Sequence, residues 1–97
     1  MNIREKIIQD INGVLLDLGC GRGRWLKEIS KRRCEVYSIG IDINLSALKD
    51  AYKEKNCNYD VVFSDISMLP IRDLAINSIL MIGVLHEVET KQTNSIL

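Results

Sequence analysis

The sequence lacks an excess of either charge, because 13 Lys and Arg residues balance 13 Asp and Glu residues. A DNA-binding domain usually carries a surplus of basic residues, so no DNA partner is expected. The three cysteines form no Cys-x-x-Cys pair, which argues against a disulfide framework and against a zinc site. We therefore expect reduced thiols, no bound metal and a cytoplasmic protein.

Long apolar runs are also missing. The longest, residues 79–85, is far shorter than the ~20 residues needed to cross a bilayer. The first six residues include Arg4, Glu5 and Lys6, at the position where a secretory signal begins its apolar region. No membrane association is therefore expected. The 97 residues, 46% of them hydrophobic, suit a single folded domain over residues 1–97 rather than a disordered chain.

Apolar periodicity predicts alternating helices and strands. Helical spacing favours helices over residues 2–11, 24–33 and 45–55, the last two with Trp25, Leu26, Ile29, Leu48, Ala51 and Tyr52 facing inward. Short apolar runs predict strands over residues 14–18, 36–41, 59–63 and 78–82, with a loop over 65–73 and a further helix from Leu85. This order predicts an α/β fold with an open, Rossmann-like parallel sheet in strand order 3-2-1-4.

Residues that could bind a ligand or take part in a reaction follow the ends of the predicted strands. A glycine-rich loop, residues 17–23, follows the first strand, and Asp42 closes the second. Asp65 follows the third strand, and residues 83–86 follow the fourth. Ligands of open α/β sheets bind outside the carboxyl ends of the strands, so these four segments predict one binding site.

The spacing of the glycines separates two cofactor classes. A nicotinamide-binding Gly-x-Gly-x-x-Gly would place its third glycine at position 24, which is Arg24 here. In addition, Asp17 would repel the two phosphates of a dinucleotide but attract a ligand that carries an ammonium group. A nucleotide-binding Rossmann protein that takes NAD remains an alternative, disfavoured by Arg24.

The motifs resemble those of class I S-adenosylmethionine-dependent methyltransferases. Residues 14–23, Val-Leu-Leu-Asp-Leu-Gly-Cys-Gly-Arg-Gly, look like the first motif of that family, and Gly-Ile-Asp-Ile-Asn at 40–44 looks like the second. Residues 64–71 resemble the third motif, and residues 78–87 resemble the strand-four motif of the small-molecule and tRNA wobble-uridine branches. The resemblance covers about residues 13 to 90 and implies S-adenosylmethionine as the cofactor.

The resemblance assigns the methionine and ribose contacts to residues near the first two strands. Asp17 would neutralise the amino group of the methionine moiety. Gly19, Cys20 and Gly21 would contact the methionine and ribose through their backbone, and Asp42 would hold the ribose hydroxyls.

Further positions would complete the cofactor site. By the same resemblance, Ile43 would pack on the adenine ring, Asp65 would accept from the adenine amino group, and the Ile66 N–H would meet a ring nitrogen. Gly23 would let the following helix pack closely on a strand, and Gly83 would face the methyl-transfer site. Asp65 could instead be a residue that caps its own loop.

A catalytic residue is harder to assign. His86 is a candidate general base for the methyl acceptor, or a residue that starts a helix and lines the pocket wall. Positioning and desolvation can supply most of the catalysis of methyl transfer. The cations of residues 22–33 form either a solvated helix face or a surface for the phosphates of a tRNA acceptor.

Length is the main departure from the family, which continues with a helix and three more strands. We expect a truncated product, a fragment, or a short protein that lacks strands 5–7, so activity of this chain alone stays open. Strand four would then be an apolar edge, which a second copy or a partner subunit could cover. The sequence predicts a methyltransferase with a small molecule or a tRNA base as acceptor. The alternative is a non-catalytic cofactor-binding remnant.

Overall fold

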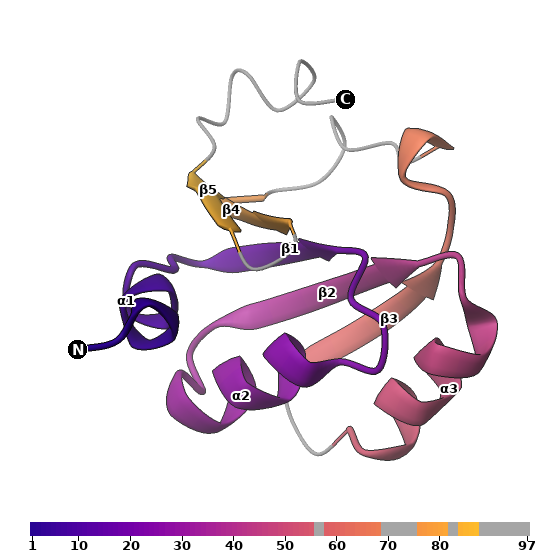
Figure 1. Ribbon diagram of the computed structural model, residues 1–97, viewed down its shortest axis with the longest axis horizontal. Helices are drawn as coiled ribbons and strands as arrows, with labels where there is room; N and C mark the ends of the chain where they lie inside the picture. Colours follow the sequence, from indigo (N-terminus) through magenta and orange to yellow (C-terminus); the bar gives the residue numbers. More distant parts are fainter. Residues whose placement is uncertain (56–57, 69–75, 82–83, 88–97) are drawn as a thin grey trace.

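A computed structural model describes residues 1–55, 58–68, 76–81 and 84–87. These residues form one sheet in the order β3-β2-β1-β4-β5 (Figure 1). The strands are β1 (Val14–Leu18), β2 (Tyr37–Asp42), β3 (Tyr59–Phe63), β4 (Ser78–Met81) and β5 (Val84–Glu87). Strands β1 to β4 are mutually parallel, which confirms the predicted order 3-2-1-4.

The helices lie where the apolar periodicity places them, with shorter bounds. They are α1 (Ile3–Gln9), α2 (Arg24–Arg32) and α3 (Leu45–Lys53), with a 3-10 turn η1 (Ile66–Met68) after β3. Figure 1 shows α2 and α3 together on one side of the sheet, with α1 near its β5 end. Asn2 and Asn44 cap α1 and α3 by accepting hydrogen bonds from the N–H groups of Glu5 and Ala47.

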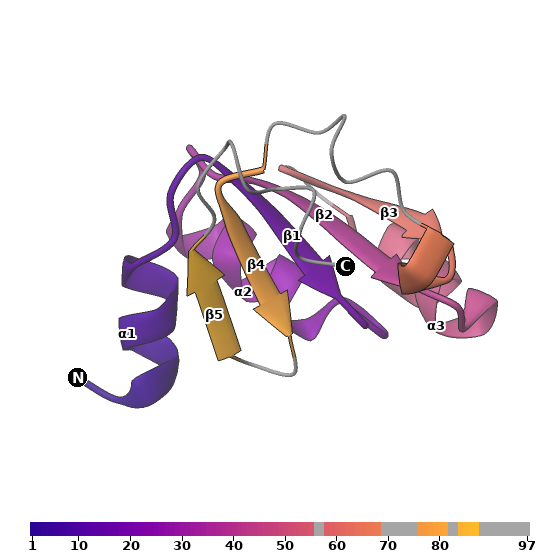
Figure 2. The ribbon, with the colours of Figure 1, turned by 90° about the horizontal axis from the view of Figure 1, so that it is seen from above.

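The segment after β4 corrects one expectation. Residues 84–87 form strand β5, antiparallel to β4, and not the start of a helix. Only two residues separate Met81 from Val84, a length that suits a hairpin and excludes a parallel crossover. Strand β5 therefore occupies the edge of β4, shown side by side in Figure 2, which we had expected to be left for a partner or a second copy.

Alternating strand residues pack on the two faces of the sheet. On the helix side, Leu15 and Leu80 pack with Ile8 of α1 and Ile29 of α2. On the other side, Leu16, Leu18, Ile41, Ile76 and Ile79 form a second buried cluster. Because β1 is buried on both faces, its near-continuous apolar run is explained by its central position in a parallel sheet.

Helix α3 departs from the predicted inward face in one residue. Leu48 and Ala51 are buried, as expected, but Tyr52 is 63% exposed. The reason is that β3 is a border strand of the described sheet, so the outer side of α3 extends beyond the surface it can cover. Its apolar surface on this side stays open.

Candidate functional site

The loop that joins β1 to α2 is built from glycines in left-handed backbone conformations. Gly19, Gly21 and Gly23 have φ values of 76°, 56° and 81°, which residues with a Cβ rarely adopt. The N–H groups of Gly19 and Cys20 both donate to the carbonyl of Ile41, at 2.7 and 3.0 Å. The loop is thereby fixed to the end of the neighbouring strand β2.

Asp42 connects the ends of β1 and β2 through its side chain. One carboxylate oxygen, Oδ2, accepts from the N–H of Gly21 at 2.8 Å. The other, Oδ1, accepts from the N–H of Asn44 at 2.9 Å, just before α3. The carboxylate is therefore held in place while each oxygen keeps capacity for a further donor.

Asp17 is a buried acid with an unsatisfied oxygen. Its residue is 3% exposed, and its Oδ2 has no hydrogen-bond partner among the residues described. Burial, and secondarily the negative charge of Asp42, raise the pKa of the Asp17 carboxyl to about 7. A buried acid without a partner is costly, so it points to a donor or cation that the site is built to receive.

The space above the glycine loop is open. A Cβ added at Gly19 or Gly21 would meet no described atom within 4 Å. These glycines therefore leave a path by which a ligand can approach the backbone closely.

Gly40 positions this loop, and the sequence reading assigned it no role. A Cβ at Gly40 would lie 2.6 Å from Cys20 Sγ and 2.6 Å from a methyl of Leu26, closer than real contacts allow. The absence of a side chain at the centre of β2 lets the loop and α2 pack directly on the strand. A lone glycine within an apolar strand was the signal that could have identified it.

Two other loop residues, Gly23 and Cys20, pack closely within the fold. Gly23 is the N-cap of α2, and a Cβ there would lie 3.0 Å from the Cβ of Ala51, so its nearest neighbour is α3. Cys20 is buried, and burial followed by the charges of Asp17 and Asp42 raises the pKa of its thiol to about 12. Its thiol stays protonated at neutral pH, which makes it a poor nucleophile.

The expected adenine-binding residues lie on the two loops after β2 and β3. Ile43 is 67% exposed, so its apolar side chain is open to solvent at the end of β2. Asp65 accepts at Oδ1 from both the N–H and the hydroxyl of Ser67, at 2.9 and 2.8 Å, so it caps its own turn. Both bonds lower the pKa of Asp65, and the bond from the N–H has the larger effect. Ile66 is half-buried against the second core cluster.

Two candidates, Gly83 and His86, lie near the end of the chain. Gly83 lies outside the described residues. His86 belongs to β5, where its backbone pairs with Ile79, so it does not start a helix. Its side chain is outside what the structure describes.

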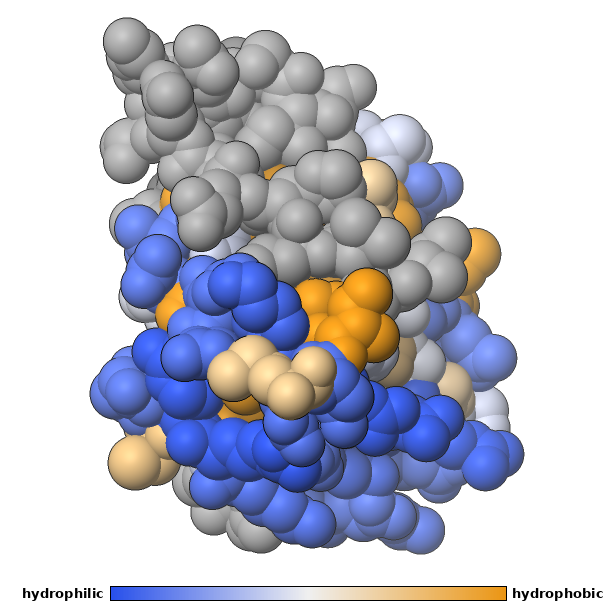
Figure 3. Space-filling model, turned by 60° about the vertical axis from the view of Figure 1, so that its left-hand side comes forward, coloured by the Kyte–Doolittle hydropathy of each residue, from blue (hydrophilic) through white to orange (hydrophobic). Residues whose placement is uncertain are grey.

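The cations after the glycine loop are largely paired. Four of them form ion pairs with acids: Arg22 with Asp50, Lys27 with Glu54, Arg32 with Glu28, and Arg33 with Glu35. Figure 3 shows the side bearing α1 and α2, whose described surface is largely hydrophilic. These pairings fit the solvated-face interpretation better than a surface kept for phosphates.

No cluster of three metal-ligating side chains occurs within residues 1–55, 58–68, 76–81 and 84–87. Across those same segments, no helix is long and apolar enough to cross a membrane.

Comparisons with known proteins agree with the fold. The family model described as "Methyltransferase domain" matches residues 15–97. "Probable tRNA methyltransferase 9B" from Bos taurus is 33% identical over 84 residues, covering 87% of this chain and 17% of that protein. The plantazolicin methyltransferase BpumL, solved with SAH, superposes with a TM-score of 0.68 at 27% identity, covering 80% of this chain and 30% of that one. Coclaurine N-methyltransferase shares the fold, with a TM-score of 0.66 at 23% identity over 79% of this chain and 24% of that one.

The chain belongs to the methyltransferase-domain family, and the cofactor of that family is S-adenosylmethionine. It spans less than a fifth of the curated tRNA methyltransferase 9B protein and less than a third of the solved plantazolicin enzyme.

Proposed function

We propose that residues 1–97 form a single domain that binds S-adenosylmethionine and serves methyl transfer. The observation that carries this proposal is the buried Asp17 carboxylate, whose Oδ2 has no partner among the described residues, beside an open glycine loop. The ammonium group of the cofactor's methionine moiety would supply both a donor and a positive charge. The residues present therefore fit the charged methionine end of the cofactor.

The ribose would lie against Asp42. Both carboxylate oxygens already accept one backbone N–H each, which fixes their position, and a carboxylate has about four lone-pair sites in total. Two ribose hydroxyls can therefore be held without breaking the bonds to Gly21 and Asn44. The backbones of Gly19, Cys20 and Gly21 would contact the methionine and ribose, and Gly23 would keep α2 and α3 close enough to hold the loop.

The adenine would cover Ile43, whose 67% exposed side chain offers an apolar surface to the ring. Asp65 uses only Oδ1 toward Ser67, so its other oxygen can accept from the adenine amino group, with the Ile66 N–H toward a ring nitrogen. Gly83 would face the transferred methyl group, by resemblance alone.

When bound, S-adenosylmethionine supplies an electrophilic methyl group that an acceptor's lone pair displaces, while the electron pair of the broken S–CH₃ bond returns to sulfur. The chain's own residues hold the cofactor and fix its direction, which is the larger part of catalysis for such a transfer. His86 stays a candidate general base for the acceptor by its residue type.

For the acceptor we propose a tRNA base or a small molecule. The likeness to the tRNA methyltransferase 9B protein supports the first, and the likeness to the plantazolicin enzyme supports the second. Because the chain spans only part of either protein, a binding module that needs a further chain for catalysis is the alternative. Methyl transfer from labelled cofactor to bulk tRNA or to small amines by the 97-residue chain would exclude that alternative.

Isothermal titration calorimetry tests the binding proposal. S-adenosylmethionine and S-adenosylhomocysteine, which share the ammonium group, should both bind, whereas NAD should not. Asp17→Asn should weaken both ligands by tenfold or more, because a charge-assisted bond contributes about 1.5–3 kcal/mol. Asp10→Asn, at the C-cap of α1 with a side chain 41% exposed, is the matched control and should leave affinity unchanged. Tighter binding of NAD than of S-adenosylmethionine would refute the proposal.

A further inference from the structure

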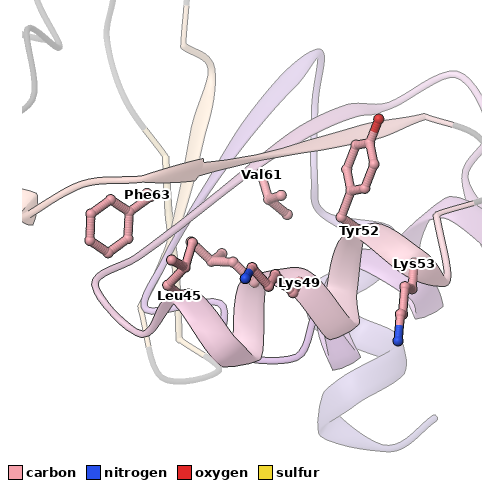
Figure 4. A pocket seen from close by; sticks show the side chains of 7 residues that line it. Leu45, Lys49, Tyr52, Lys53, Val61 and Phe63 are labelled. Atoms are coloured by element: carbon pink, nitrogen blue, oxygen red, sulfur yellow. The ribbon is translucent and has the colours of Figure 1, made fainter.

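An open groove lies between α3 and β3, away from the glycine loop. Its volume is about 360 Å³, and it is lined by Leu45, Leu48, Lys49, Tyr52, Lys53, Val61 and Phe63. Figure 4 shows these side chains along α3 and the adjoining strand. Tyr52 is 63% exposed and Phe63 is 61% exposed, so large apolar side chains face solvent where a folded domain would normally bury them.

Helix α3 separates its charges between two sides. Asp50 of α3 and the C-cap residue Glu54 form ion pairs with Arg22 and Lys27, on the side of α2 and the glycine loop. The charged residues that line the groove are Lys49 and Lys53. The groove therefore combines apolar walls with positive charge, while the acids of the same helix are held on its other side.

Strand β3 adds a backbone edge to this groove. Among the described residues it pairs with β2 alone. The N–H of Ser64 donates to the backbone carbonyl of Asp42, and the carbonyl of Asn58 accepts from the N–H of Ser38. The even-numbered residues of β3 therefore direct their backbone groups toward β2. Since backbone groups alternate along a strand, those of Val61 and Phe63 are directed away from the sheet. The same two residues line the groove with their side chains.

We propose that the edge of β3 and the groove beside it bind an extended segment of a partner protein, in which two acidic side chains are neighbours on one face and apolar side chains flank them on the same face. The segment would add a strand to β3 through Val61 and Phe63, and its apolar side chains would enter the groove. Lys49 and Lys53 are four residues apart on the helix, ~6.0 Å of rise, close to the ~6.6 Å between every second residue of a strand. Acidic side chains at that spacing can therefore meet both lysines.

A second copy of this chain fits less well. Two β3 edges paired about a two-fold axis would bring Lys49 and Lys53 of both copies to the same contact, where like charges repel. The charge of the groove thus favours a partner of opposite sign over self-association.

Heteronuclear NMR with a defined probe tests this inference on the 97-residue chain. The probe is a blocked peptide, Thr-Leu-Thr-Glu-Thr-Glu-Thr-Leu, whose two Glu are neighbours on one face, and its twin carries Lys in place of Glu. The acidic peptide should shift the amide signals of Val61, Phe63 and Tyr52, and it should bind at least about tenfold more tightly than the basic twin, because two attractive charge pairs become repulsive.

The double variant Lys49→Glu, Lys53→Glu should reverse this preference, and Lys31→Glu on α2 is the matched control that should leave it unchanged. All variants lie at exposed positions, so their folding can be checked from the unchanged spectra of the core. The inference is overturned if the two peptides bind alike, if the shifts map outside the groove, or if sedimentation shows a dimer that the double variant dissociates. Cofactor titration is independent of these outcomes, so a failure here leaves the cofactor proposal standing.

Discussion

The backbone N–H of Gly21 donates to the Asp42 carboxylate at 2.8 Å, which joins the loop after β1 to the end of β2. Asp42, which we propose binds the ribose, therefore also shapes the glycine loop. Since one side chain serves both purposes, substitutions at position 42 should alter loop order and ligand affinity together.

Replacing Asp42 tests that dual role. Asp42→Ala should reduce S-adenosylmethionine affinity by tenfold to a hundredfold or more, because each lost charge-assisted hydrogen bond costs about 1.5–3 kcal/mol. Asp42→Asn keeps an acceptor oxygen for Gly21 and should retain more loop order than the alanine variant. Calorimetry measures the first effect, and amide hydrogen exchange at Gly21 measures the second. Unchanged affinity in Asp42→Ala would show that the ribose assignment is wrong.

Gly40 offers a test of packing beneath the loop. Gly40→Ala should lower the free energy of unfolding by about 1–3 kcal/mol, because its Cβ would overlap Cys20 and Leu26. Urea denaturation measures the change. Gly19→Ala is an informative control, since its Cβ meets open space and its cost is limited to a left-handed backbone, roughly 1–2 kcal/mol. If Gly40→Ala proved neutral, the loop would not depend on direct contact with β2.

Asp17 should make stability depend on pH in the direction opposite to that of a salt-bridged acid. Its pKa rises from 3.8 in the unfolded chain to about 7 in the fold, so the native state holds the extra proton between those values. Its contribution is therefore most favourable below pH 4 and is lost progressively as pH rises to about 7. At ~1.4 kcal/mol per pKa unit, the loss is on the order of 4 kcal/mol.

Asp17→Asn removes this titration and should stabilise the protein at pH 8 while weakening the cofactor. The measurement is the difference in unfolding free energy between the two proteins from pH 4 to pH 8, with Asp10→Asn as the control for surface charge. A difference that does not vary with pH would contradict the buried-acid account. Proton release on cofactor binding near pH 6.5, seen as buffer-dependent binding heat, is the matching expectation for the wild type.

The thiols should differ in reactivity. Burial, with the charges of Asp17 and Asp42, raises the pKa of Cys20 to about 12, whereas Cys34 is exposed. Alkylation by iodoacetamide at pH 8, followed by peptide mapping, should label Cys34 at least 100-fold faster than Cys20, because only the thiolate reacts. Equal labelling rates would show that the loop opens readily. Bound cofactor should slow Cys20 further and leave Cys34 unchanged.

Much of the fold was predictable because β1 to β3 and the helices between them have strong local signals. The apolar run of β1 and the helical spacing of α2 and α3 are read directly from the sequence. Strand β5 was not predicted, because a four-residue segment of mixed polarity carries little periodicity, and its pairing with β4 decides its conformation.

The candidate site shows the same division. Asp17, Asp42 and the loop glycines were predictable from motif and spacing, because the backbone conformation they adopt depends on residue type. The hydrogen bond from Gly21 to Asp42 and the contact between Cys20 and Gly40 were not, since they join residues about twenty positions apart. The exposure of Tyr52 was missed because helical periodicity records which side is apolar and not whether anything covers it.

The division of charge on α3 also bears on how this protein can change over evolutionary time. Asp50 and Glu54 are engaged with α2 and the glycine loop, so replacing them would disturb contacts near the site. Lys49 and Lys53 are exposed and line only the outer groove, where surface substitutions usually change stability by less than about 0.5 kcal/mol. One or two mutations can therefore change which partner segment the groove binds, while the proposed cofactor site around Asp17 and Asp42 stays intact.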